Sequence, residues 1–191
     1  MNKKLGLILF SAISALIFCS STLFDNDTDL CKSFVQLLNN QKSEDAKVLC
    51  SDSLKVNYKY SNITKRRVEF FTYLRKNEKL NQQLLIDSTQ INNGKVNVYC
   101  KSRNNFNQYL KLHQLPIRYS FLVKNNLIYE INIDSLKGYN DSLKINDRRW
   151  LFFEKWIKTT HQSINLYYIK LQYPDSLTTL AKEFYDSAVK K

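Results

Sequence analysis

Glycine, proline and histidine are scarce in this chain of 191 residues, which contains three, two and two of them. The glycines, Gly6, Gly94 and Gly138, stand apart, so a phosphate-binding loop and a dinucleotide fingerprint are both absent. Few Gly and Pro also leave little sequence for flexible linkers, and no repeat or low-complexity tract is visible. We therefore predict one compact domain rather than a string of modules.

The two histidines, His113 and His161, do not fall in a metal-binding pattern. Neither belongs to a His-Glu-x-x-His motif, and no paired Cys-x-x-Cys motif is present. These absences disfavour zinc chemistry and a His-based catalytic triad. We predict that the chain uses no metal and no cofactor, and we assign no catalytic residue.

The first 21 residues have the order of an export signal. Asn2-Lys3-Lys4 supplies positive charge, and the apolar run from Leu5 to Phe18 follows it. This run of 14 residues is shorter than the roughly 20 apolar residues that a membrane-spanning helix needs. We predict that residues 1–21 direct export, and that the chain is periplasmic, secreted or membrane-anchored at the cell envelope.

Three ways of processing this segment stay open. Leu16-Ile17-Phe18-Cys19 resembles a bacterial lipobox, with Cys19 as the lipidated residue, although such boxes want a small residue where Phe18 stands. Simple cleavage after Ser21 is the second reading. The third is an uncleaved anchor that extends to Phe24. Membrane contact is expected only through Cys19 lipidation or an uncleaved N-terminal segment.

The chain is basic, with 29 Lys and Arg against 17 Asp and Glu. Without Lys3 and Lys4 the count is 27 against 17, a net charge of +10. Such a charge favours anionic partners, but the Lys residues are scattered among many Asn, Ile and Tyr residues, as is common in AT-rich genomes. The runs Lys65-Arg66-Arg67 and Arg148-Arg149 lie near predicted helix starts, where solvated charge is common. Together with the export signal, this disfavours a nucleic-acid partner.

Three cysteines remain beyond the signal: Cys31, Cys50 and Cys100. An odd number in an exported chain permits at most one internal bridge. We predict Cys31 with Cys50 as the pair, because each falls on one of two consecutive short helices that can pack side by side. The alternative is three buried, reduced thiols that behave as small hydrophobic groups.

Helical periods occur at both ends of the predicted domain, residues 25–191. Leu30, Phe34, Leu37 and Leu38 recur at i, i+4, i+7 and i+8. A second helix is predicted from Ser43 to about Asn57, and a third is capped by Thr64, with Val68, Phe71 and Leu74 inward. A helical extension is predicted from about residue 146, with Asp147 as its cap, Trp150, Phe153 and Ile157 on one side, and a last helix from Ser176.

From Leu84 the period changes to two, which indicates strands. Val96, Val98 and Cys100 alternate with polar residues after the turn Asn92-Asn93-Gly94. A second hairpin is predicted over residues 117–133, and Leu110 and Leu112 suggest a further strand. We predict about four antiparallel strands.

Helices followed by this meander resemble the cone-shaped nuclear-transport-factor-2-like (NTF2-like, cystatin-like) fold, which includes ketosteroid-isomerase-like and polyketide-cyclase-like proteins. The segment from Leu115 to Ile131 is similar to the paired strands that close the sheet in such domains, and the signal with the helical tail resembles exported bacterial members. The resemblance covers about Leu30 to Ile133 and implies an α+β fold, in which N-terminal helices pack on a curved antiparallel sheet and C-terminal helices follow. No catalytic residue of that superfamily can be placed on this chain.

We expect a non-catalytic domain that presents its concave sheet to a small apolar ligand or a partner protein. The residues predicted to line the concavity are Tyr119, Phe121, Tyr129 and Ile131, although parity alone does not decide which face of the sheet is concave.

Two other functions compete with this expectation. One is a ketosteroid-isomerase-like or polyketide-cyclase-like enzyme that uses a buried carboxylate, with Asp134 or Glu130 opposite Tyr119 or Tyr129. A deep pocket with a raised carboxyl pKa would favour the enzyme, and a cavity filled by aromatic side chains would disfavour it. The other is a cell-envelope assembly component whose aromatic C-terminal helices bind another chain, which an exposed apolar patch on them would support.

Overall fold

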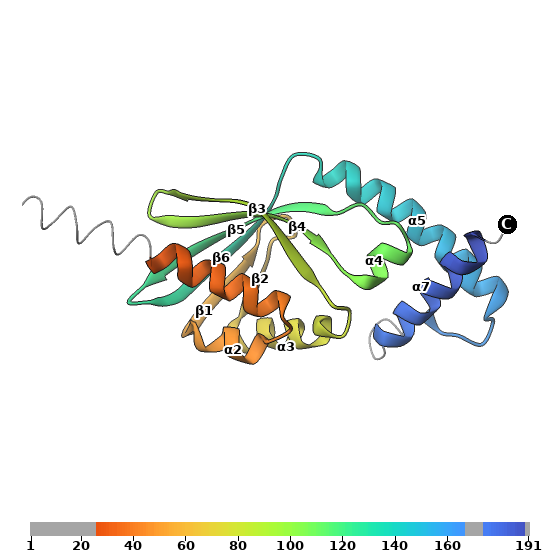
Figure 1. Ribbon diagram of the computed structural model, residues 1–191, viewed down its shortest axis with the longest axis horizontal. Coiled ribbons are helices and arrows are strands. Elements are labelled where there is room, and N and C mark those ends of the chain that lie inside the picture. Colours follow the sequence, from red (N-terminus) through yellow and green to blue (C-terminus); the bar gives the residue numbers. More distant parts are fainter. Residues whose placement is uncertain (1–25, 167–173, 190–191) are drawn as a thin grey trace, which may run out of the picture.

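The computed structural model describes residues 26–166 and 174–189 (Figure 1). The predicted signal, residues 1–21, and its Cys19 lie outside the described residues. Within the described residues, no helix combines the length and the apolar character needed to cross a membrane.

Helices and strands alternate along the sequence, with the strands in three pairs separated by α3 and α4. The helices are residues 26–39 (the N-terminal helix), α2 Ser43–Val48, α3 Arg67–Glu78, α4 Asn105–Tyr109, α5 Tyr139–Thr160 and α7 Pro174–Val189. The strands are β1 Cys50–Tyr58, β2 Ile63–Arg66, β3 Gln83–Asn92, β4 Lys95–Arg103, β5 Leu115–Lys124 and β6 Leu127–Ser135.

The strands form one curved sheet in the order β2-β1-β6-β5-β4-β3. The predicted α+β class and the sheet over residues 84–133 are confirmed. The predicted count of about four antiparallel strands is too low, because β1 and β2 join the sheet. Neighbouring strands are antiparallel except β1 and β6, which pair in parallel. The sheet is therefore mixed.

The prediction of a helix from Ser43 to Asn57 is wrong beyond Val48. The spacing of Ala46, Leu49 and Cys50 fits a helical face, but from Cys50 the chain is β1, where buried Leu54 and Val56 alternate with outward residues. Cys50 therefore begins a strand and does not lie on a second helix.

Two further boundaries also differ from the prediction. Thr64 lies in β2 rather than at a helix cap, and Val68, predicted to point inward from α3, is 72% exposed. Leu110 and Leu112 do not form a strand, because the preceding residues make α4, capped by the side chain of Asn104. Helix α5 begins at Tyr139, well before the predicted cap Asp147.

The hairpin turns follow the sequence signals closely. Asn93 and Gly94 have φ values of 50° and 68°, and Asn125 and Asn126 have 49° and 58°. Asn and Gly tolerate this left-handed region, and two such residues in succession match the twist of a tight hairpin. These turns set the register of β3 with β4 and of β5 with β6.

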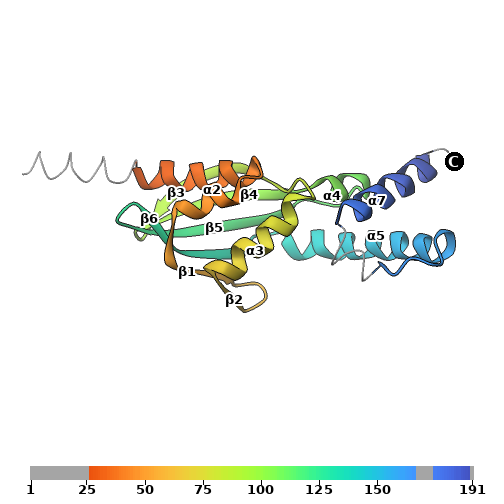
Figure 2. The ribbon, with the colours of Figure 1, turned by 90° about the horizontal axis from the view of Figure 1, so that it is seen from below.

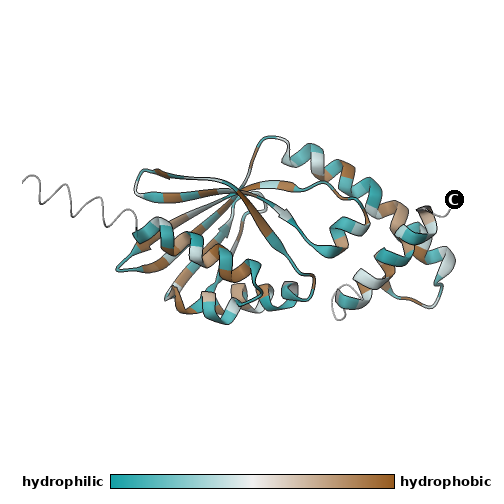
Figure 3. Ribbon diagram, in the orientation of Figure 1, coloured by the Kyte–Doolittle hydropathy of each residue, from teal (hydrophilic) through white to brown (hydrophobic). Residues whose placement is uncertain are grey.

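The N-terminal helix, α2 and α3 cover one face of the sheet, called here the inner face (Figure 2). Apolar residues alternate with polar ones along the strands (Figure 3), and the apolar set turns toward these helices. We call the resulting core the cone cluster; its largest fully buried side chains include Phe34, Phe70, Phe71 and Phe121.

A second core lies at the other end of the molecule, between α4, α5 and α7 (Figure 2). We call it the C-terminal cluster; its buried residues are Phe106, Leu110, Phe153, Ile157, Leu177, Leu180 and Ala181. The amide of Asn146 ties α5 to the loop between α4 and β5. Its Nδ2 donates to the carbonyl oxygen of His113 at 2.9 Å, and its Oδ1 accepts from the His113 N–H at 2.7 Å.

Candidate functional site

Three of the four predicted concavity residues belong to the inner face. Tyr119, Phe121 and Ile131 are at most 8% exposed and lie in the cone cluster. The rings of Tyr119 and Phe121 stack at 6.1 Å, and Phe34 meets Phe121 edge-on at 5.7 Å. Tyr129 is half-buried outside the cone cluster, at an irregularity where Leu122 pairs with Glu130 but Val123 pairs with Ile128.

The space left inside the cone is very small. A cavity of about 30 Å³ is lined by Leu38, Asn39, Ser43, Leu74, Glu78, Gln82, Leu84 and Tyr119. That volume corresponds to about one water molecule, whereas sites for drug-sized ligands span about 300–1,000 Å³. The carboxylate at this cavity, Glu78, accepts a hydrogen bond from the Ser43 N–H at 2.8 Å and so fixes the start of α2.

Tyrosines pack around the open edge of the cone near β2. The ring of Tyr60 lies 6.0 Å from Tyr58 and 5.4 Å from Tyr139. The ammonium of Lys65 sits 3.8 Å from the ring centre of Tyr73 and 5.3 Å from that of Tyr58, within cation–π range. Partial burial raises the pKa of Tyr60 to about 12.

The carboxylates considered for an isomerase lie on the opposite, outer face of the sheet. Asp134 forms an ion pair with Arg118 at 2.7 Å, away from Tyr119. The pKa of Glu130 is lowered, first by the hydrogen bond from Asn132 and then by the charge of Lys95. A carboxylic acid that must hold a proton at neutral pH needs the opposite shift. The sheet thus separates both carboxylates from the buried Tyr119.

A depression that the sequence did not reveal occupies this outer face. Its volume is about 420 Å³, and we call it the outer trough. Its lining consists of Lys59, Asn92, Asn93, Lys95, Asn97, Tyr99, Arg118, Ser120, Glu130, Asn132 and Asp134. Alternation along each strand places these polar residues on one face, but the register that brings them together is a property of the folded sheet.

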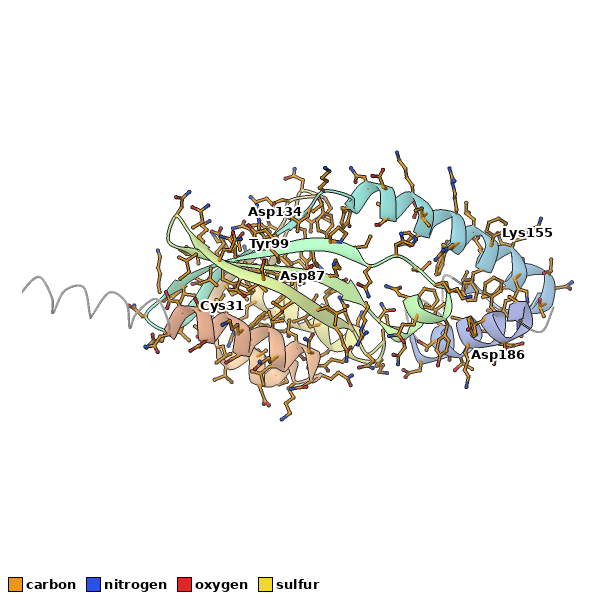
Figure 4. All side chains as sticks on the ribbon, turned by 45° about the horizontal axis from the view of Figure 1, so that its top comes forward. Cys31, Asp87, Tyr99, Asp134, Lys155 and Asp186 are labelled. Atoms are coloured by element: carbon orange, nitrogen blue, oxygen red, sulfur yellow. The ribbon has the colours of Figure 1, made fainter. Side chains whose placement is uncertain are left out.

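Helix α5 has an apolar inward face, and its outward face carries two large apolar residues that are exposed to solvent. Phe153 is buried against Trp156 and Phe184, whereas Leu151 and Phe152 are 62% and 69% exposed. Arg148 and Lys155 lie one turn to either side of these two residues and are exposed as well. Figure 4 shows Lys155 on the side of α5 away from α7.

The cysteines Cys31, Cys50 and Cys100 have free thiols, all at most 3% exposed in the cone cluster. Burial raises the pKa of all three, that of Cys50 and of Cys100 to about 12. The charge of Cys50 adds to the rise at Cys31, so the two thiols lie in one neighbourhood. Their bridge stays a prediction, although its premise of two packed helices is wrong.

Metal-binding geometry is not found in the described residues. No group of three or more His, Cys, Asp or Glu side chains there could hold a metal ion. His161 lies 3.1 Å from the carboxylate of Glu183, and His113 is exposed beside α5.

The fold is that of the NTF2-like proteins. A putative ketosteroid isomerase from Kribbella flavida superposes with a TM-score of 0.51 at 11% identity, covering 60% of this chain and 81% of its own. An LEH-like epoxide hydrolase from M. tuberculosis gives 0.54 at 13% identity, covering 67% and 96%. A putative polyketide cyclase from Xanthomonas campestris gives 0.50 at 11% identity, covering 62% and 97%. No protein-family model and no curated protein matches the sequence.

Proposed function

We propose that this chain of NTF2-like fold is an exported, non-catalytic domain that binds a partner protein through the outward face of α5. The observation that carries the proposal is the exposure of Leu151 and Phe152, at 62% and 69%, on a helix whose other face is packed. Adjacent large apolar residues on a surface helix favour an interface, because water contact with them is unfavourable.

The positively charged residues beside Leu151 and Phe152 indicate what kind of partner surface would fit this helix. Arg148 precedes Leu151 and Phe152 by three and four residues, and Lys155 follows them by four and three, so all four side chains share one surface. Apolar anchors in the centre with charged groups at the rim are typical of protein interfaces. The matching partner has an apolar pocket bordered by carboxylates.

Two competing functions have less support. A small apolar ligand needs a cavity, and the space inside the cone is about 30 Å³. An isomerase-like enzyme needs a carboxyl group held in an apolar pocket, whereas Asp134 is ion-paired with Arg118 on the outer face. A Δ5-3-ketosteroid incubated with the purified chain should therefore gain no conjugated-enone absorbance above the buffer control.

Partner binding is tested by replacing both anchors with serine, L151S/F152S. Material captured from the envelope fraction by the wild-type chain identifies the partner, and titration with the purified partner measures Kd. We expect the double substitution to weaken binding between about tenfold and a hundredfold, because anchor residues carry much of the binding free energy.

A matched control is Val68→Ser, since Val68 is 72% exposed on α3, far from α5 in the sequence. Both variants should keep wild-type stability within about 0.5 kcal/mol, as exposed substitutions usually do. Equal Kd values for the wild-type chain and L151S/F152S would refute the α5 interface. So would an equal loss of binding in Val68→Ser.

Cleavage of the export signal and the state of the three thiols are tested by measuring the intact mass of the protein with and without thiol alkylation. We expect the mature chain to lack either residues 1–18, with lipid on Cys19, or residues 1–21. In native buffer near pH 8 the three thiols should react slowly, because reagents attack the thiolate and burial keeps it scarce. In denaturant, three added alkyl groups would indicate three free thiols, and one added alkyl group would indicate the Cys31–Cys50 bridge. An unprocessed mass in envelope preparations would contradict cleavage.

A further inference from the structure

Strand register arranges the outer trough as a polar floor between two walls. The floor belongs to a row with one residue from each strand: Gln90, Asn97, Ser120, Asn132, Asn57 and Thr64. The central three, Asn97, Ser120 and Asn132, are at most 8% exposed and lie in the trough. Short polar side chains at these positions make the floor lower than its surroundings.

Longer side chains two residues away along the strands make the walls. Tyr99, Arg118 and Asp134 stand in one paired row, with Lys59 at its end. Lys95 and Glu130 stand on the other side, 3.5 Å apart. Figure 4 shows Tyr99 and Asp134 on the side of the sheet away from the helix that carries Cys31.

The trough has the size of a small-ligand site. Its walls are four residues apart along each strand, about 13 Å, and its floor crosses three strands, about 10 Å between the outer two. Its volume of about 420 Å³ falls within the usual range for such sites. A short, extended polar chain fits within these dimensions.

The floor retains unused hydrogen-bonding capacity. Ser120 Oγ donates to Asn97 Oδ1 at 2.5 Å, and Asn57 Nδ2 donates to Asn132 Oδ1 at 3.0 Å. Asn97 Nδ2 also donates to the Lys95 carbonyl oxygen at 3.5 Å, and Asn132 Nδ2 donates to Glu130 Oε1. An amide has two donor hydrogens and two acceptor sites, so each asparagine keeps one donor and one acceptor site for a ligand. In the wall, a terminal nitrogen of Arg118 donates to Asp134 at 2.7 Å, so the guanidinium borders the floor with its position fixed.

Charge in the walls is largely compensated within the protein. Arg118 is paired with Asp134 and Lys95 with Glu130, while Lys59 adds one positive charge. A strongly ionic ligand would have to compete with these pairs. A neutral ligand with many hydroxyl groups would not, because each hydroxyl both donates and accepts.

We propose that the outer trough binds a neutral linear oligosaccharide, whose hydroxyl groups bond to the floor amides and to the hydroxyl of Ser120. The site is independent of the α5 interface, since it lies on the sheet and uses none of the same residues. Either proposal can fail without the other.

The test uses four neutral hexasaccharides as probes, namely maltohexaose, cellohexaose, chitohexaose and laminarihexaose, each titrated into the full chain by calorimetry. We expect at least one to bind with a Kd below about 1 mM, in the range of weak specific binding. The variant N97A/S120A should weaken that binding by about tenfold or more. It removes both partners of one hydrogen bond, so neither is left unpaired and folding should be preserved.

Two further variants separate a local effect from a structural one. Arg118→Lys keeps the positive charge but lacks the planar guanidinium that borders the floor, and should also weaken binding. Gln90→Ala lies on the same row outside the trough lining and should leave Kd unchanged. Failure of all four probes, or equal affinity in N97A/S120A, Arg118→Lys and the wild-type chain, would overturn the proposal. It would also be overturned if these variants weakened binding of the protein partner instead.

Discussion

Replacing Phe121 with alanine is expected to destabilise the chain by about 3–5 kcal/mol, the usual loss for a buried phenylalanine. Phe121 is fully buried in a central strand, in ring contact with Phe34 and Tyr119. Truncation removes these contacts and leaves a cavity that the paired strands β4 and β6 prevent from collapsing. Denaturant unfolding followed by circular dichroism measures the loss.

Phe152→Ala is the matched control, because it removes the same atoms from a side chain that is 69% exposed. Its stability should stay within about 0.5 kcal/mol of the wild-type chain. If Phe121→Ala cost as little as Phe152→Ala, Phe121 could not be part of a packed core. A small domain is stable by only about 5–15 kcal/mol, so the expected difference is easily measured.

Replacing Phe153 with alanine should cost a similar amount, about 3–5 kcal/mol, but in the C-terminal cluster. Phe153 is fully buried and its ring meets those of Phe106, Trp150, Trp156 and Phe184 at 5.6 to 6.2 Å. The rings lose their common neighbour when it is truncated, so α5 and α7 should separate more readily.

The chain carries natural reporters for its two clusters. Both tryptophans, Trp150 and Trp156, pack against the C-terminal cluster, and the three described cysteines lie in the cone cluster. Phe153→Ala should shift tryptophan emission to the red while the thiols stay protected from alkylation. Phe121→Ala should expose the thiols instead. If both variants changed both signals equally, the two clusters would unfold as one unit.

Sequence reasoning identified the meander correctly because its signals are local. Alternation and the Asn-Gly and Asn-Asn turns fix β4, β5 and β6 without reference to the rest of the chain. It failed at β1 because Ala46, Leu49 and Cys50 carry helical spacing into the strand. The parallel pairing of β1 with β6 joins segments about 75 residues apart, for example Asn57 with Asn132, and leaves no local pattern.

For the candidate sites, too, the sequence predicted what depends on local patterns and missed what depends on the pairing of distant strands. Parity grouped Tyr119, Phe121, Tyr129 and Ile131, of which all but Tyr129 lie in the cone cluster, and their face became clear only from the helices that cover it. Ser120 and Asn132 are nearly as buried on the other face, so burial alone could not decide. The outer trough depends on cross-strand register over several strands, which alternation within one strand does not specify.

The central claim is that the cone of this NTF2-like fold is a packed core, so that binding takes place on its outer surfaces. Calorimetric titration of the wild-type chain and of Phe121→Ala with benzene and with a ketosteroid tests it directly. We predict no saturable binding to the wild-type chain, and binding of benzene to Phe121→Ala, because a dry cavity left by a lost aromatic ring accepts such a ligand. Stoichiometric binding of the steroid by the wild-type chain, at micromolar Kd, would contradict the claim.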